Sequence, residues 1–474
     1  MITDNKNLID RLKHKLNIKP KNEELALLGG RPVRTKEFRS KPFIDKKEIN
    51  LVKKLMRDGT FSRFVGSPLP GTRESLTAKS TDLELGDSSS SFLGGKYVKT
   101  FESKWSEILD VDYSISVNSA TTGLVTALLA LDLEPGSEVI TTPFSFTATA
   151  AAIVLAGCVP IFCDIDPETF CLSPEKLKET ITSNSKCVIA VHWCGNAGDF
   201  DEIVDICKKN KIKLVEDSAQ APGTMYRGKN LGCWGDMGVF SFNEPKNIMT
   251  GEGGMIVTNN PQYAKKARLI RNHGEAIMDE SDEDHEIINI VGSNYRLTEI
   301  QAAIGVVQVS KLNFLNSIRN RNYKYLNDKL LSLNCNYLKP QKITHKDSFS
   351  AYTAAFRWNS SDSGVHRDII LEALIGEGIP AFKGYPRLMS EQPMNKRKIG
   401  YGSKPWGKKD KEDKVLSNAE FLVGEEFLGF FLMGWPNKKK DIDNIVFAFE
   451  KIINNLDSLR KYNSKNTDFI LGRK

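Results

Sequence analysis

The sequence of 474 residues lacks the cysteine patterns of metal sites and disulfide frameworks. Its eight cysteines include no Cys-x-x-Cys pair, and most of them lie in apolar segments that are typical of strands or helices. We therefore expect reduced thiols in the core of a cytoplasmic protein, with no metal site. The N-terminus also lacks the apolar stretch of a secretory signal, so no signal peptide is expected.

Uninterrupted apolar runs of membrane-spanning length are missing as well. Residues 139–163 carry no charged side chain, but Pro143, Gly157 and Pro160 break the run, which is rich in Ser, Thr and Ala. This composition predicts a buried helix that leads into a strand, and we expect no contact with a membrane.

A strong excess of either charge is absent too. The formal net charge is +7 and the isoelectric point is near 8.7, with lysines spread along the chain. Nucleic-acid binding proteins usually show a more clustered basic footprint, so we expect no nucleic-acid partner. Anionic small molecules are the partners that this charge favours.

The apolar pattern that is present predicts an α/β fold with two lobes. Between residues 93 and 315, short apolar strands alternate with amphipathic helices, which is typical of a mostly parallel sheet covered on both faces. We expect this large domain to be followed by a smaller α/β domain over residues 316–456. Seven strands are expected in the sheet, over residues 114–117, 138–142, 159–164, 187–192, 213–217, 238–242 and 255–258.

Several segments lie outside this pattern. Residues 1–92 are expected to form an N-terminal segment with a helix over 45–58 and a long loop insertion over 60–92, which is either a lid, an interface loop or a disordered surface loop. A helix over 264–277, closed by Gly274, is expected before an acidic loop over 279–286. A lysine-rich insertion near 395–414 and a polar tail over 457–474 complete the division of the chain.

One lysine stands out in the segment 240–254, FSFNEPKNIMTGEGG. Lys246 lies between an apolar strand and a glycine cluster, after which a second strand begins at Met255. An ammonium beside an apolar wall is disfavoured in its charged form, so the pKa of Lys246 would fall and its free amine could act as a nucleophile. Taken alone, the residue could equally be an exposed lysine of a turn.

Polar residues also follow three other predicted strands. Asp217 ends the strand of KLVEDSAQAPG, where a carboxylate is costly without a partner, although it could also cap a helix. Ser119, Ala120 and Thr121 open a helix whose free N–H groups could bind a phosphate, or could simply be capped. Phe146, in TTPFSFTATA, could pack in the core or against a flat ligand. The role of His192 stays open.

The whole set resembles the DegT/StrS-type sugar aminotransferases, which are pyridoxal phosphate (PLP) enzymes of fold type I, the aspartate aminotransferase fold. The pattern S-F-x-x-x-K followed by T-G-E-G-G carries this resemblance most strongly. It implies that Lys246 holds the cofactor as an aldimine and that Ser241 binds its phosphate. Pro245 stands where the family usually has an aliphatic residue or threonine, so the turn before the lysine is expected to be tighter.

The resemblance also assigns the remaining site residues. Ala120 and Thr121 correspond to the phosphate-binding turn, with Ala120 in place of the usual glycine, and Phe146 to the aromatic residue that stacks on the cofactor ring. Asp217 would pair with the protonated ring nitrogen, and Gln220 would lie near the ring hydroxyl. A further set of residues, SNYRLTEIQAA, is similar to a family segment whose asparagine, here Asn294, reaches the phosphate in the neighbouring subunit. A homodimer is therefore implied.

By this resemblance, the enzyme moves an amino group from glutamate or glutamine to a keto sugar, expected to be nucleotide-linked. Two alternatives remain. One branch of the family consists of sugar dehydratases, which have histidine where this chain has Lys246, so the lysine favours transamination. A non-catalytic regulatory protein that keeps the fold is the other alternative, and the presence of Lys246, Asp217 and Asn294 argues against it.

Overall fold

The centre of the large lobe is a seven-stranded sheet in the order β1-β9-β8-β5-β4-β2-β3. The computed structural model describes residues 24–64, 76–83, 92–278, 286–344, 349–398 and 415–462. The strands of the sheet are β1 (Tyr113–Val117), β2 (Glu138–Thr141), β3 (Val159–Phe162), β4 (Ser185–Val191), β5 (Lys213–Asp217), β8 (Met237–Ser241) and β9 (Gly254–Thr258). Only β9 runs against its neighbours in this sheet, so the prediction of seven mostly parallel strands is confirmed.

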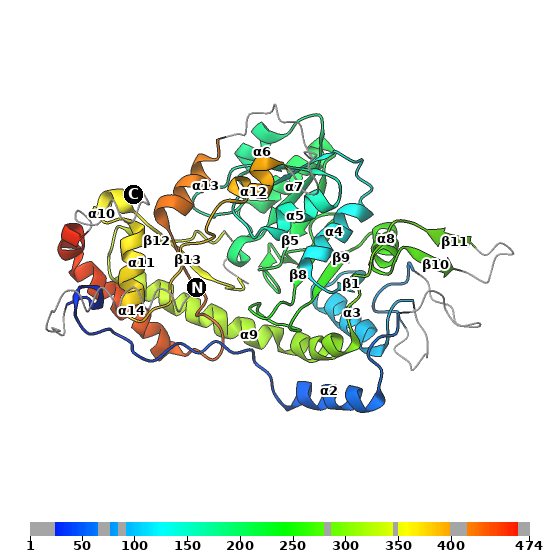
Figure 1. Cartoon of the computed structure of the whole chain (residues 1–474), viewed down its shortest axis with the longest axis horizontal. Helices are drawn as coiled ribbons and strands as arrows, with labels where there is room; N and C mark the ends of the chain where they lie inside the picture. The colour runs from blue at the N-terminus through cyan, green and yellow to red at the C-terminus, as the bar shows by residue number, and fades with distance from the viewer. Residues whose placement is uncertain are drawn as a thin grey trace.

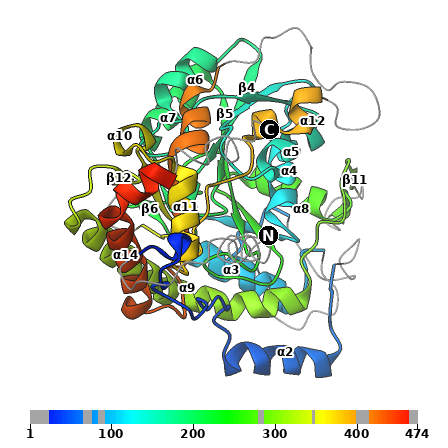
Figure 2. The same ribbon diagram turned by 60° about the vertical axis from the view of Figure 1, so that its left-hand side comes forward.

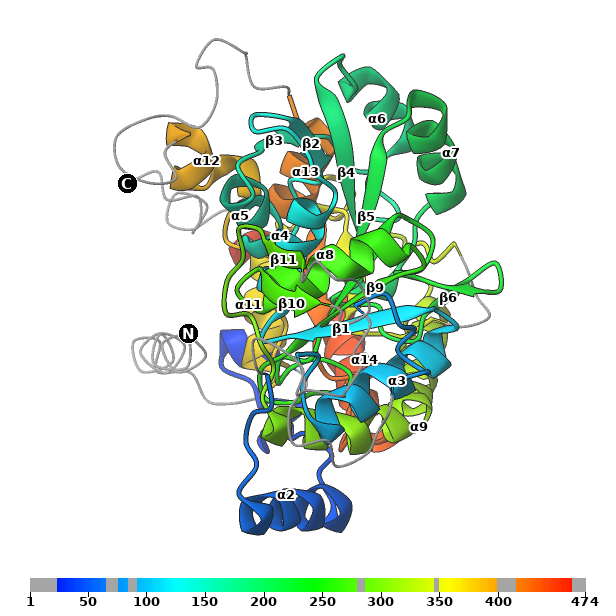
Figure 3. The same cartoon turned by 90° about the vertical axis from the view of Figure 1, so that its right-hand side faces the viewer.

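Helices cover both faces of this sheet, as its burial on both sides requires. They are α3 (Lys96–Leu109), α4 (Ala120–Ala130), α5 (Ala148–Leu155), α6 (Pro174–Thr180), α7 (Phe200–Asn210), α8 (Pro261–Arg271) and α9 (Glu299–Ser332). Figure 3 shows α4 and α5 on one side of β4 and β5, and α6 and α7 on the other. Strand alternation accordingly sends Val215 into the core with α4 and α5, and Leu214 into the core with α7.

The smaller lobe is built on a three-stranded antiparallel sheet in the order β12-β13-β14. Its elements are β12 (Leu338–Pro340), β13 (Ala354–Trp358), α10 (Ser360–Ser363), α11 (Arg367–Gly376), α12 (Pro393–Arg397), α13 (Ser417–Phe421), β14 (Phe427–Phe430) and α14 (Lys439–Asn454). Leu459 is fully buried in the core of this lobe, which therefore extends beyond residue 456, where the polar tail was expected to begin. Helix α9 runs along the base of both lobes (Figure 1) and passes through the expected boundary at residues 315–316.

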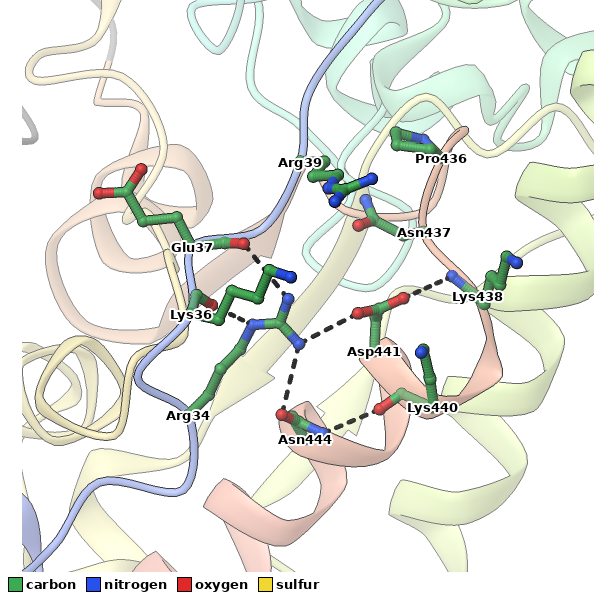
Figure 4. Close-up of a pocket in the computed structure, with 10 residues that line it drawn as sticks. All are labelled: Arg34, Lys36, Glu37, Arg39, Pro436, Asn437, Lys438, Lys440, Asp441 and Asn444. Atoms are coloured by element: carbon green, nitrogen blue, oxygen red, sulfur yellow. Dashed lines mark hydrogen bonds and ion pairs between the residues drawn. The ribbon is translucent and has the colours of Figure 1, made fainter.

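The N-terminal segment is attached along the outside of both lobes. A short 3₁₀ helix, η1 (Ala26–Leu28), packs in the smaller lobe, and α2 (Lys46–Asp58) lies outside the lobes below α9 (Figures 1 and 2). Between them, Arg34 donates to Asp441 at 3.0 Å and to Asn444 at 3.4 Å, at the edge of a largely basic surface pocket (Figure 4). None of the expected site residues lines this pocket. Lys311 of α9 holds α2 through Glu48 at 2.5 Å.

One predicted helix is shorter than expected. Helix α8 ends at Arg271, because Gly274, at a φ of +74°, turns the chain and donates its N–H to the carbonyl of Leu269 at 2.7 Å. Residues 275–277, expected in the helix, instead belong to β10 (Glu275–Met278), which pairs with β11 (Glu286–Asn289). Residues 279–285, much of the 60–92 insertion and residues 399–414 lie outside the described residues.

The eight cysteines are free thiols, and seven of them are buried. Among the described residues, no helix has the length and apolar character needed to cross a membrane.

Glu216 fixes the carboxyl end of β5 from the face opposite to Asp217. Its carboxylate is fully buried and accepts hydrogen bonds from the backbone N–H groups of Gly232 at 2.6 Å, Trp234 at 2.6 Å and Gly235 at 2.7 Å. His192 Nε2 lies 2.9 Å from the same carboxylate. A buried carboxylate with this many donors holds strand, loop and imidazole in one arrangement.

Replacing Glu216 by glutamine should therefore destabilise the protein. The amide would point an N–H group at one of these backbone donors, and we expect a loss of roughly 1–3 kcal/mol in the free energy of unfolding. Urea unfolding followed by circular dichroism measures this loss. Exposed Glu134→Gln serves as the control, and equal stabilities of the two variants would contradict the role given to Glu216.

Candidate active site

Asp217 lies at the carboxyl end of β5, in the row of strand ends where ligands bind in sheets of this kind. Its Oδ2 accepts a hydrogen bond from Thr149 Oγ1 at 2.9 Å, and its Oδ1 accepts one from the N–H of Ala219 at 3.2 Å. The carboxylate is buried, and loss of water raises its pKa above the ordinary value. Among the described residues it has no ion pair with a cation, so it could take a positively charged ligand atom.

Lys246 lies on the turn between β8 and β9, as the sequence predicts. Its N–H donates to the carbonyl of Asn243 at 2.9 Å, which closes a tight turn that includes Pro245. The Nζ atom lies 4.5 Å from the centre of the Tyr352 ring. Loss of water lowers the pKa of Lys246 to about 8, while Asp217 and Cys194 act in the opposite direction. Roughly a tenth of this amine is therefore uncharged at pH 7, far more than for a lysine with the ordinary pKa.

A cradle for a phosphate group lies where α4 begins. Ser119 caps the helix by accepting the N–H of Thr122 at 3.2 Å, and helix geometry leaves the N–H groups of Ala120 and Thr121 without an intrahelical acceptor. Ser241, the last residue of β8, pairs with Gly254 of β9. A Cβ atom on Gly254 would lie 2.7 Å from the nitrogen of Ala120 and from the backbone of Ser119, so glycine lets the start of α4 pack closely against β9. The structure thus brings together the residues predicted to hold the phosphate.

Aromatic and amide side chains line the neighbouring wall. The Phe146 side chain is 59% exposed, and its ring centre lies 6.3 Å from that of Tyr385. Gln220 accepts the N–H of Cys194 at its Oε1, at 2.8 Å, so its amide NH₂ is free for another acceptor. That group bonds to the hydroxyl of Tyr385. An exposed aromatic face at a strand end is suited to stacking on a flat ring.

Asn294 and His192 lie outside this cluster of side chains. Asn294 is exposed, its Oδ1 accepts from Arg296 Nε at 2.9 Å, and its carbonyl lies beside Asn118, just before α4. His192 is buried against Glu216 and makes an edge-to-face contact with Phe200. The histidine therefore has a structural setting, while Asn294 is accessible to a second chain.

Some residues of the site escaped the sequence analysis. Thr149 binds Asp217 from α5, and Tyr352 covers Lys246 from the chain that leads into β13. Thr149 lies in the quoted stretch TTPFSFTATA and could have been found by pairing its hydroxyl with the strand-end carboxylate. No local signal marks Tyr352, which is more than a hundred residues from Lys246 in the sequence.

These groups fit pyridoxal phosphate in three respects. The amine of Lys246 is available to hold an aldehyde, the buried Asp217 carboxylate suits a protonated ring nitrogen, and the N–H groups at the start of α4 suit a phosphate.

Comparison with known proteins agrees with this fit. The sequence profile of the DegT/DnrJ/EryC1/StrS aminotransferase family matches residues 78–409. GDP-perosamine synthase of Caulobacter vibrioides is 36% identical over 286 residues, which cover 60% of this chain and 75% of that protein. A protein of Streptoalloteichus tenebrarius, provisionally named an L-glutamine:3-amino-2,3-dideoxy-scyllo-inosose aminotransferase, is 28% identical over 92% of this chain and 99% of its own length.

Solved structures share the fold over most of the chain. An aminotransferase from Psychrobacter cryohalolentis matches with a TM-score of 0.73 and 25% identity, over 89% of this chain and 100% of that one. The E. coli GDP-4-keto-6-deoxy-D-mannose-3-dehydratase, which contains hydrated PLP, matches with a TM-score of 0.70 and 24% identity, over 87% of this chain and 100% of that one. The protein is therefore a PLP-dependent aminotransferase that belongs to the DegT/DnrJ/EryC1/StrS aminotransferase family.

Proposed function

We propose that the enzyme transfers an amino group from glutamate or glutamine to the carbonyl carbon of a nucleotide-linked keto sugar. The observation that carries this proposal is the Lys246 amine, whose pKa is lowered to about 8 beside the Asp217 carboxylate. The donor becomes the corresponding 2-oxo acid and the acceptor C=O becomes CH–NH₂, so atoms and electrons balance without a further reactant. A relative named for a GDP-linked amino sugar, and another named for an aminocyclitol and L-glutamine, support this substrate class.

In this proposal each side chain has a distinct task. When bound, PLP supplies the electron sink and the carbonyl group that carry the amino group between the two half-reactions. Lys246 Nζ holds the cofactor, takes a proton from the α-carbon of the donor, and later delivers one to the former carbonyl carbon of the acceptor. Asp217 keeps the ring nitrogen protonated, and Thr149 and the N–H of Ala219 hold that carboxylate in place.

The remaining predicted residues bind the cofactor. Phe146 packs on the ring, and Gln220, whose oxygen accepts the N–H of Cys194, directs its amide NH₂ toward the ring hydroxyl as well as toward Tyr385. Ser241 and the N–H groups of Ala120 and Thr121 bind the phosphate at the positive end of α4. The close packing of Gly254, the partner of Ser241, against Ser119 and Ala120 brings these residues together and supports this assignment.

A sugar dehydratase is the second candidate, because one structural neighbour bears that name. By the family resemblance, dehydratases have histidine at the position of Lys246, so the lysine favours amino transfer. Mixing the holoenzyme with glutamate, or with glutamine, separates the candidates: the cofactor absorbance should shift and the matching 2-oxo acid should accumulate. No shift with either donor would reject the proposal.

We also propose that the enzyme works as a homodimer in which Asn294 binds the phosphate held by the neighbouring subunit. Its exposure in the single chain supports this role. The family resemblance implies that the asparagine of one subunit reaches the phosphate held by the other.

Lys246→Ala should abolish turnover while the fold persists. Loss of the proton-transferring amine is expected to lower the rate by at least about a thousandfold. Treatment with borohydride should fix the cofactor to the wild-type chain at residue 246, as read by mass spectrometry, and to no residue of the variant. Exposed Lys47→Ala is the control. Retained turnover, or trapping at another lysine, would remove Lys246 from this role.

The pH dependence of amine acetylation in the apoenzyme tests the setting of Lys246. Only the uncharged amine reacts, so the midpoint for Lys246 should lie near pH 8, the value to which loss of water lowers its pKa. The lysine side chain of a model peptide should react with a midpoint near the ordinary pKa, about 10.4. Since the negative charge of Asp217 raises the pKa of Lys246, Asp217→Asn should move the midpoint to lower pH. Equal midpoints for Lys246 and the model peptide would contradict the desolvation.

Complementation tests whether each subunit contributes Asn294 to the site of its neighbour. Lys246→Ala is expected to be inactive, and Asn294→Ala to bind PLP roughly tenfold more weakly through loss of one hydrogen bond to a charged group. In a mixed dimer, one of the two sites would regain both intact residues, so the purified mixed dimer should have about half of the activity of the wild-type dimer at limiting PLP. Absence of any recovery would place Asn294 in its own subunit's site.

A further inference from the structure

We propose that Phe431 forms a binding subsite for the saturated six-membered ring of the acceptor. The subsite rests on the proposed function, because its ligand is the keto substrate of the second half-reaction. Nothing in the family profile or in the names of the relatives assigns a role to this residue.

Phe431, the residue that follows β14, lies on the side of the smaller lobe that faces the large lobe. Leu428 and Phe430 lie in the core of the smaller lobe, whereas the Phe427 ring contacts Phe144 and Trp193 at 5.6 and 5.4 Å. The Phe382 ring contacts both Phe427, with ring centres 5.7 Å apart, and Phe431, so Phe431 lies on the same side as Phe427. Phe144 and Trp193 follow β2 and β4, so this side faces the ends of the large-lobe strands that carry the site.

Two neighbouring rings hold Phe431 in place and leave part of it open. Phe382 stacks on it with ring centres 4.4 Å apart and an angle of 12° between the ring planes. Gly429 makes room for Phe382, because a Cβ atom at this position would lie 2.6 Å from the Phe382 ring. Tyr352 contacts it edge-on at 5.5 Å. The Phe431 side chain is nevertheless 51% exposed. One face is thus covered by Phe382, and the exposed area is available to another flat apolar surface.

Tyr352 links this surface to the reacting amine. The same ring that touches Phe431 lies 4.5 Å from Lys246 Nζ, so a single side chain separates the two. Arg319 holds the backbone that carries this side chain by donating to the carbonyls of Ala351 and Tyr352 at 3.4 and 3.2 Å. A group lying on Phe431 is therefore one side chain away from the amine of Lys246.

This position selects the ring of the acceptor rather than its nucleotide. The C–H faces of a pyranose or cyclitol are apolar and flat enough to cover an aromatic ring, and their burial is favourable. A nucleobase is separated from the reacting ring by a diphosphate and a ribose, so it would lie farther from Lys246. Glutamate and glutamine have no such ring and should not use the subsite.

Separate measurement of the two half-reactions tests the proposal. With Phe431→Ala holoenzyme, we expect the half-saturating concentration of GDP-4-keto-6-deoxy-D-mannose, the acceptor named for a structural neighbour, to rise about tenfold. The rate and concentration dependence of the donor half-reaction should stay within about twofold of wild type. Phe431→Trp, which restores a flat ring, should keep acceptor binding near the wild-type level. Phe447→Ala, at an exposed phenylalanine of α14 that is 53% accessible, is the matched control and should change neither half-reaction.

Other outcomes overturn the subsite. Unchanged acceptor binding in Phe431→Ala would do so, as would equal slowing of both half-reactions, which would indicate displacement of Tyr352. Weaker binding of GDP alone would indicate contact with the nucleotide, and a change in sedimentation would indicate contact between subunits. If wild-type enzyme reacts with the donor but binds neither this acceptor nor 3-amino-2,3-dideoxy-scyllo-inosose, the cyclitol in the name of a relative, the acceptor class and the subsite are rejected together, while the role of Lys246 stands.

Discussion

The burial of Asp217 and the partial exclusion of water from Lys246 are the constraint on which the site depends. Burial disfavours the charged form of each group, so the pKa of the amine falls and that of the carboxyl rises, while each charge partly stabilises the other. Thr149 and the N–H of Ala219 compensate part of the cost of the buried carboxylate. A protonated ring nitrogen beside Asp217 would compensate more of it, so binding of the cofactor and stability of the fold are expected to be coupled.

Adjacent residues of β5 divide structural and chemical work between the two faces of the sheet. Glu216 points toward α7 and is saturated by backbone donors and His192, whereas Asp217 points toward α5 and retains capacity for a cation. The hydrogen bonds of Glu216 on one face of the sheet fix the end of β5, and this strand end positions Asp217 on the other face. Both residues carry a carboxylate, and strand alternation alone therefore explains why the two neighbours have different tasks.

The sequence predicts what depends on local pattern and misses what depends on distant packing. The seven strands were found within two residues because buried strands are short apolar runs between turn residues, and Lys246 was found on its turn for the same reason. Helix α8 was predicted too long, since the end at Arg271 is set by the turn at Gly274 and by the pairing of β10 with β11. Tyr352 and Phe431 come from the smaller lobe, and no periodicity places them beside residue 246. The roles of Asn294 and of the cofactor-binding residues stay predictions.

The two lobes contribute different properties to the same enzyme. The large lobe supplies the amine, the carboxylate and the phosphate cradle, and these must keep their positions for any amino transfer. The smaller lobe supplies the rings of Tyr352 and Tyr385 on segments that do not belong to the central sheet. A change of ring size or polarity at Phe431, farther from the amine, alters the surface offered to a substrate and leaves the side chains that contact Asp217 and Lys246 unchanged. An unchanged catalytic lobe combined with a variable facing surface is therefore a physical route by which one fold can accept different sugars and cyclitols.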